Sequence, residues 1–212
     1  LNFPHNPSGA TLSAADLDFA QQPTRLAFNA GNDVPVRHDR FHTWASYVDD
    51  FKHALIVHGT ARQDEANRTL ALRFQSTLAD AYAETLSPVV KDAEVSDADL
   101  AAHDLIVLGS ATDNTVLARL APALPVELGK NSFRWQGRTY AAPDDGLFLV
   151  LPNPRNPARA LYLFLANSAL ELHDMTRNHV PSLPSWAVFK GAEVKEQGFH
   201  PVDRFLLDLA TE

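Results

Sequence analysis

Residues 51–67, FKHALIVHGTARQDEAN, indicate the fold class of this chain. The apolar run at residues 54–57 predicts a buried strand, the HGT at residues 58–60 a polar turn, and the acidic residues after it a helix. The stretch DLIVLGSATDN at residues 104–114 repeats this arrangement. Two apolar strands that each end in glycine and a hydroxyl residue, followed by a helix, are typical of an open α/β sheet. In such sheets a ligand binds beyond the carboxyl ends of the strands.

The composition is that of a globular protein. The chain has 212 residues, 45% hydrophobic and 21% charged, which suits one α/β domain with an attached arm. The net charge of −8 disfavours a nucleic-acid partner, which would require a basic face. The absence of cysteine excludes disulfides and thiolate catalysis without deciding the compartment. No apolar run approaches the roughly 20 residues that cross a bilayer, so we expect no membrane span.

Residues 1–50 differ from the rest of the chain. They are rich in Pro, Asn, His and Asp, and we expect an extended arm or linker with two short strands, TRLAF and DVPVRH. The apolar residues of this arm, Trp44 and Tyr47 among them, pack either on the sheet or on a neighbouring domain. The N-terminus lacks the basic and apolar regions of a signal peptide, and with Leu1 as the first residue we expect a processed product or a fragment. Residues 51–212 are expected to form the α/β domain.

Periodicity predicts the elements of that domain. The apolar positions of residues 63–84 recur every three to four residues, which predicts a helix, and the more polar VVKDAEV at residues 89–95 predicts an edge strand. SFRWQGRTY at residues 132–140 predicts a β-hairpin turning at Gln136–Gly137. GLFLVLP and ALYLFLA are separated by the proline-rich NPRNPAR, in which no helix of any length can form. These two strands are therefore antiparallel neighbours or joined by a short crossover.

Polar clusters follow three of the expected strands. If these strands are parallel and adjacent, the clusters meet at one rim, where helix N-termini could hold an anion. The alternative is that the hydroxyl residues cap helices and form turns, and neither GxxxxGK[ST] nor GxGxxG occurs. The candidate ligand-binding residues are Gly59, Thr60, Asn67, Gly109, Ser110, Asn114, Asn167 and Ser168.

Signals for catalysis are weak. Ser110 lies in LGSAT, which lacks the G-x-S-x-G of a nucleophile elbow, and Thr60 and His58 are the other weak candidates. His58 is better explained as a hydrogen-bonded core histidine. His38 and His42 in HDRFH have the i, i+4 spacing of zinc ligands, but the sequence lacks HExxH and an obvious third ligand. We expect no cofactor, because the strand-end loops lack the Ser/Thr/Gly run that would wrap a flavin phosphate.

Three stretches in order carry a family likeness: ALIVHGT with Asn67, then AEVSDADLAAHDLIVLGSATDN, then LPVELGKNSFRWQGRTYAAPDDGLFLVLPNPRNPARALYLFLANS. Together, over residues 51–170, they resemble the flavodoxin-like accessory domain at the C-terminus of some large secreted bacterial hydrolases, whose parents are peptidase-like or esterase-like and include zinc aminopeptidase-like proteins. The resemblance implies a catalytic domain of a parent protein as partner and an extracytoplasmic location, secreted or periplasmic. It transfers no catalytic residues.

We therefore expect a three-layer α/β sandwich with a flavodoxin-like, mostly parallel sheet, an inserted β-hairpin and an extended N-terminal arm. The expected function is a non-catalytic accessory or interaction domain of a secreted hydrolase, a peptidase first of all. Two alternatives remain open. One is a small esterase or peptidase that acts from the rim through Thr60, Ser110, Asp113 and a histidine. The other is a binder of small anionic ligands.

Overall fold

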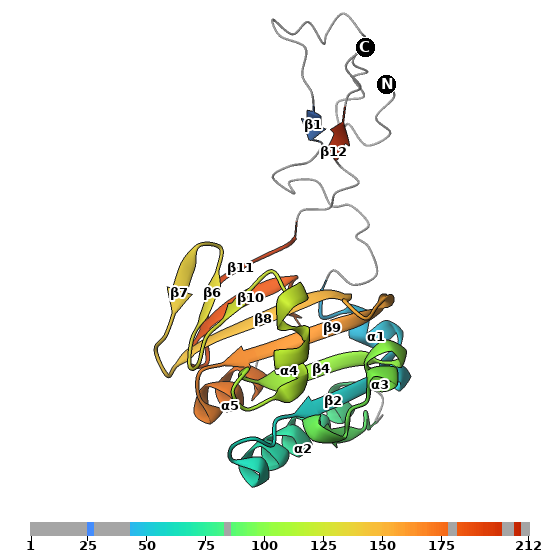
Figure 1. Cartoon of the computed structure of the whole chain (residues 1–212), viewed down its shortest axis with the longest axis vertical. Helices are drawn as coiled ribbons and strands as arrows, with labels where there is room; N and C mark the ends of the chain where they lie inside the picture. The colour runs from blue at the N-terminus through green and yellow to red at the C-terminus, as the bar shows by residue number, and fades with distance from the viewer. Residues whose placement is uncertain (1–24, 28–42, 83–85, 178–181, 201–205, 209–212) are drawn as a thin grey trace, which may run out of the picture. The chain divides into compact units, whose positions relative to one another are not determined.

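A computed structural model describes residues 25–27, 43–82, 86–177, 182–200 and 206–208. The chain divides into two compact units, one made of Leu1–Arg37 with Pro201–Glu212 and the other of His38–His200. The described part of the first unit is an antiparallel pair of short strands, β1 (Arg25–Ala27) and β12 (Leu206–Asp208) (Figure 1). The second unit contains the predicted α/β sheet.

That sheet has seven strands in the order β11-β10-β8-β9-β4-β2-β3. Five of them, β2, β3, β4, β9 and β10, run in the same direction, because β8 is antiparallel to both of its neighbours and β11 is antiparallel to β10. The prediction of a mixed α/β fold with a mostly parallel sheet is confirmed. The strands are β2 (Ala54–His58), β3 (Val89–Lys91), β4 (Asp104–Gly109), β8 (Asp145–Asn153), β9 (Asn156–Ala166), β10 (Trp186–Lys190) and β11 (Glu193–Gly198).

Helices cover both faces of the sheet (Figure 1). On one face lie α1 (Ser46–Asp49), α2 (Asp64–Ala81) and α5 (Ala169–Arg177), and on the other α3 (Asp97–Ala102) and α4 (Thr115–Leu120). Successive residues of β2 enter the two cores in turn, since side chains alternate across a strand. This double burial explains why the central strands have continuous apolar sequences.

The helix predicted at residues 63–84 is α2, and the edge strand predicted at residues 89–95 is β3, which lies at one end of the sheet. After only three residues this strand gives way to a 3₁₀ turn, Asp92–Glu94. Ser96 then caps α3 through a capping box with Asp99, since each side chain accepts from the backbone N–H of the other. The structure thereby follows the predicted order of elements through β4.

Two residues of the predicted arm belong to the core of the larger unit. Trp44 is fully buried, and its ring packs edge-on against Tyr162 of β9 with a centroid distance of 5.1 Å. Tyr47 is stacked on Trp44 at 5.0 Å, and its hydroxyl is hydrogen-bonded to Ser87 Oγ (2.9 Å). Of the two placements expected for these side chains, the structure therefore has packing on the sheet. The predicted strand DVPVRH lies outside the described residues.

The predicted hairpin consists of β6 (Phe133–Trp135) and β7 (Arg138–Tyr140), and β5 (Glu127–Leu128) adds a third strand. Both turn residues, Gln136 and Gly137, have positive φ (47° and 81°), as a two-residue type I′ turn requires. The side chains of Phe133 and Trp135 are buried in the core on the α3/α4 side. The small sheet is thus anchored to the domain by its aromatic residues.

The proline-rich segment joins β8 and β9 as a tight antiparallel hairpin, which confirms the first of the two predicted connections. Its asparagines hold the hairpin against the end of α3. Asn153 Nδ2 donates to Leu100 O (2.7 Å), and Asn156 Nδ2 donates to Ala101 O (2.8 Å). Carbonyls that the last helical turn leaves unpaired are satisfied in this way.

Candidate functional site

The carboxyl ends of β2, β4 and β9 lie side by side, because these strands are neighbours and parallel. His58 at the end of β2 pairs with Leu108 of β4, and Gly109 of β4 pairs with Leu165 of β9. The polar residues that follow each strand therefore gather along one edge of the sheet, which we call the rim. The chemistry open to the rim depends on what these side chains already contact.

Gly59 allows the loops after β2 and β4 to touch. A Cβ atom at this position would overlap the carbonyl group of Asp113, and Ala61, two residues further on, donates its N–H to Asp113 O (3.1 Å). The side chain of Asn67 closes the same loop from α2, since its Nδ2 donates to Gly59 O (3.0 Å) and Arg62 O (2.9 Å). Gly59 and Asn67 thus hold two loops together.

Thr60 donates its hydroxyl to Asp92, a residue that the sequence analysis did not single out. Thr60 Oγ1 lies 2.7 Å from Asp92 Oδ1, and the backbone N–H of Thr115, at the start of α4, donates to Asp92 Oδ2 (2.6 Å). Burial of Asp92 opposes its charged form, but the hydrogen bonds from Thr115 and Thr60 outweigh burial and hold its pKa below the usual value. The only sequence signal for it is its position directly after a polar edge strand.

Ser110, the candidate nucleophile, donates to a carboxylate. Its Oγ lies 2.8 Å from Asp113 Oδ2 and 2.9 Å from Thr112 Oγ1, while Asp113 Oδ1 is ion-paired with Arg62 Nε (3.2 Å). A triad needs a histidine within hydrogen-bond reach of the hydroxyl. Among the described residues, no histidine is hydrogen-bonded to Ser110 or Thr60.

His58 is buried at the end of β2. Its Nδ1 lies 3.4 Å from Gly59 O and 3.8 Å from Asp64 Oδ1, and Asp64 Oδ2 in turn accepts from Lys91 Nζ (3.1 Å). These contacts are those of a core histidine beside a surface ion pair. The two metal candidates, His38 and His42, lie outside the described residues.

Asn114 joins three elements at the centre of the rim. Its Oδ1 accepts from the N–H groups of Val116 (3.0 Å) and Leu117 (3.3 Å) and so caps α4. Its Nδ2 donates to Val57 O at the end of β2 (3.3 Å) and Leu108 O at the end of β4 (3.1 Å). Asn114 is only 1% exposed, and these four hydrogen bonds occupy both polar atoms of its side chain.

The residues after β4 and β9 complete the rim. Gly109 has φ 112°, a conformation that favours glycine. Asn167 Nδ2 donates to Ala142 O (2.9 Å) and Tyr140 O (3.3 Å), which fastens the loop after β7. Ser168 Oγ accepts from Glu171 N (3.1 Å) and caps α5. The structure thus brings all eight predicted ligand-binding residues to one edge, and each has a structural partner or a conformational role; ligand binding by them stays a prediction.

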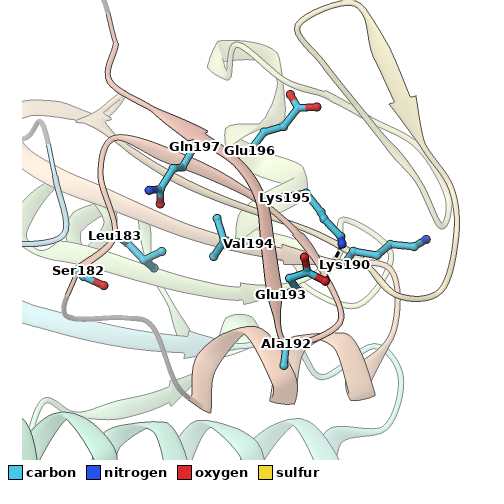
Figure 2. A pocket seen from close by; sticks show the side chains of 9 residues that line it. All are labelled: Ser182, Leu183, Lys190, Ala192, Glu193, Val194, Lys195, Glu196 and Gln197. Atoms are coloured by element: carbon cyan, nitrogen blue, oxygen red, sulfur yellow. Dashed lines mark ion pairs between the residues drawn. The ribbon is translucent and has the colours of Figure 1, made fainter. Parts of the chain in front are cut away.

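Hollows near the sheet differ greatly in size. The hollow at the rim between Ser110, Gly129 and Asn167 measures only about 10 Å³, which is barely room for one water molecule. A groove of about 800 Å³ runs along the edge strand β11 instead (Figure 2). It is lined by Ser182, Leu183, Lys190, Ala192, Glu193, Val194, Lys195, Glu196 and Gln197.

The two lysines that line this groove are both in ion pairs, one with a groove residue and one with a residue beside it. Lys195 Nζ lies 2.6 Å from Glu193 Oε2, and Lys190 Nζ lies 2.7 Å from Asp144 Oδ1. The register of β11 shifts opposite Val188, as in a β-bulge. Charged side chains and a bulge are features that discourage a further strand from pairing with a sheet edge, so we assign no strand-binding role to β11.

Two comparisons of the sequence with known proteins find no match. No protein-family model matches the sequence, and a search of curated proteins finds no significant match. In the part of the chain that the structure describes, no helix is long and apolar enough to cross a membrane. The same residues contain no group of three or more His, Asp or Glu side chains placed to hold a metal ion.

Proposed function

We propose that this chain is a non-catalytic accessory domain of a secreted hydrolase, with a peptidase as the first choice of parent. One observation carries the proposal: the rim side chains that could act on a substrate are engaged in closing strand-to-helix joints. Thr60 binds Asp92, Ser110 binds Asp113, and Ser168 caps α5. A rim built in this way serves to hold the sheet and its helices together.

The order of the parallel strands agrees with the flavodoxin-like part of the proposal. Four adjacent strands of the sheet are β3, β2, β4 and β9, in this spatial order. When these parallel strands are numbered 1 to 4 along the chain, the spatial order is 2-1-3-4, which is the order at the start of the flavodoxin-like sheet. The departure is β8, an antiparallel strand inserted between β9 and β10. The secreted parent and the extracytoplasmic location rest on the sequence resemblance alone, and the catalytic domain of that parent is the proposed partner.

The anionic-ligand alternative receives less support from the rim. Gln63, the residue before helix α2, has φ 53° and provides no side-chain cap, which leaves the first amides of the helix without a side-chain partner there, as an anion site would need. The first turn, however, carries Asp64 and Glu65. Their negative charges already complement the helix dipole and would repel an anionic group. We therefore do not propose a phosphate-binding role.

A hydrolase assay with two matched variants tests the proposal. Ser110→Ala and Ser96→Ala each remove a serine hydroxyl that bonds an aspartate, one at the rim and one at the exposed start of α3. We expect the wild-type chain and both variants to lack esterase and peptidase activity on chromogenic esters and peptides, and both variants to melt a few degrees lower than wild type. Hydrolysis by the wild type that Ser110→Ala abolishes and Ser96→Ala retains would overturn the proposal.

A further inference from the structure

Glu171 is the most unusual buried side chain of the described residues. It is 1% exposed, and neither of its carboxylate oxygens has a hydrogen-bond partner among those residues. Buried carboxylates are normally paired, because an unpaired charge in an apolar environment is costly. A buried carboxyl without partners therefore suggests a group that is uncharged under some conditions and charged under others.

The local sequence indicates a different position for this side chain. Ser168 and Glu171 have the spacing of a capping box, in which the glutamate returns to the backbone N–H of the serine. Only half of this motif forms: Ser168 Oγ accepts from Glu171 N (3.1 Å), whereas the Glu171 carboxylate makes no such bond. The carboxylate instead lies against β8, next to Gly146.

Gly146 of β8 provides the space for this carboxylate. A Cβ atom on Gly146 would lie 2.6 Å from Glu171 Oε1 and 3.1 Å from Met175 Sδ, so any larger residue would collide with the glutamate. Glycine inside a strand often marks the close approach of another group. The first turn of α5 thus docks on β8 through a carboxyl group placed over the backbone of Gly146.

The charged groups around Glu171 do not neutralise it. Asp144 and Asp145, at the start of β8, and Asp174, one turn along α5, all act to disfavour its charge. Lys190 of β10 is bound to Asp144 (2.7 Å) and Asp145 (3.0 Å). On α5 itself, His173 Nδ1 lies 3.2 Å from Asp174 Oδ1, so His173 is engaged with an aspartate rather than with Glu171.

The remaining neighbours add little compensation. Arg73 of α2 is directed at His173 Nε2 (3.1 Å). The Gly191 amide, in the turn after β10, lowers the pKa of Glu171 in part, but its hydrogen bond goes to Asp144 O (2.9 Å). The net result is that burial, reinforced by the three aspartates, raises the pKa of Glu171 to about 7.

We propose that Glu171 is a pH-sensitive latch between α5 and β8. When its carboxyl is protonated, the first turn of α5 stays docked over Gly146. When the carboxyl is ionised, this turn moves outward so that the carboxylate reaches water. The turn also forms one wall of a largely apolar groove of about 580 Å³ between α2 and α5, through Ala169, Leu170 and His173. Release of the latch widens that groove. Leu170, which is already 71% exposed, moves with it.

Hydrogen exchange at several pH values tests the latch in the full chain. The exchange rate of the α5 amides is divided by that of the α2 amides in the same sample. This ratio removes the pH dependence that the chemical exchange of every unprotected amide has. For a carboxyl that titrates near pH 7 when docked and near pH 4.5 when released, opening of α5 relative to α2 should rise about tenfold between pH 6 and pH 8. Glu171→Gln should make the ratio independent of pH.

Glu193→Gln is the matched control, because Glu193 is a mostly exposed glutamate of β11 that is paired with Lys195 of the same strand. It should keep the wild-type pH dependence. Equal pH dependence in the wild type and Glu171→Gln would overturn the proposal. A second measurement needs no variant: the side-chain carboxyl carbon of Glu171, followed by NMR, should titrate near pH 7, and a midpoint near pH 4.5 would overturn the latch.

Discussion

Replacement of Asn114 by alanine should destabilise the larger unit more than the loss of an ordinary helix cap. Loss of the cap on α4 costs about 1 kcal/mol. Two buried strand carbonyls, Val57 O and Leu108 O, also lose the amide donor that joins them, which adds about 1–3 kcal/mol. We therefore expect a decrease of about 3 kcal/mol in the free energy of unfolding, measured by urea denaturation, and a melting temperature about 6–12 °C lower.

Two further variants separate the cap from the strand contacts. Ser96→Ala removes an exposed cap of the same kind at α3 and should cost only about 1 kcal/mol. Asn114→Asp keeps the oxygen that caps α4 but replaces the donor with an oxygen that faces two carbonyls, so at pH 7 it should destabilise at least as much as alanine. If Asn114→Asp is as stable as wild type, or Asn114→Ala costs no more than Ser96→Ala, the strand contacts contribute nothing.

Four other substitutions have expected outcomes that denaturation can check. Gly59→Ala should cost about 2–4 kcal/mol, because the new methyl group overlaps the next loop, and a cost below about 0.5 kcal/mol would show that the loops separate easily. Trp44→Ala should lower the free energy of unfolding by about 3–5 kcal/mol, whereas a loss below about 1 kcal/mol would show that Trp44 does not contribute to the core of the larger unit. Asp92→Asn should cost about 2 kcal/mol at pH 7. Since the pKa of Asp92 is lowered in the fold, the stability that its carboxylate contributes is present above the ordinary carboxyl pKa and is lost as the pH falls. The free energies of unfolding of wild type and Asp92→Asn should therefore become equal in acid. Glu171→Gln should show the opposite pH dependence. Because the pKa of Glu171 is raised from 4.5 to about 7, its carboxyl contributes its full stability to the fold below pH 4.5 and loses that contribution as the pH rises through 7. The glutamine variant should therefore have a free energy of unfolding up to about 3 kcal/mol higher than wild type at pH 8 and no gain below pH 4.5.

The elements that could be predicted from the sequence are those whose pattern is local. β2 and β4 are buried on both faces, so their apolar runs are continuous and predict strands directly. Gln136–Gly137 predicts its hairpin because few residue pairs tolerate two positive φ angles. The prolines of residues 152–157, in and around the turn between β8 and β9, exclude a helical crossover, which leaves an antiparallel pair as the simplest connection.

Long-range contacts could not be predicted in the same way. The sequence around Trp44 is polar and rich in turn-forming residues, so it indicates an arm, yet the indole packs against Tyr162, more than a hundred residues away. The position of β8 between β9 and β10 likewise depends on strand pairing, which has no local signal. At the rim, the convergence of Gly59, Ser110 and Asn114 follows from the parallel order of two strands, but the role of Asp92 emerges only when its loop meets α4.

The buried polar groups of the rim and Glu171 differ in a way that directs the search for function. Asn114 and Asp92 are buried but fully paired, so they stabilise a single arrangement of the loops and gain nothing from moving. Glu171 is buried without hydrogen-bond partners although its spacing from Ser168 is that of a capping box. The docked state is therefore maintained at a free-energy cost that rises with pH. Departures of this kind from local rules concentrate at functional sites. We therefore expect a partner or an environmental signal to act on the first turn of α5 rather than on the hydroxyl groups of the rim. Opening of α5 that depends on pH in the wild type, and not in Glu171→Gln, would support the first turn of α5 as the responsive site.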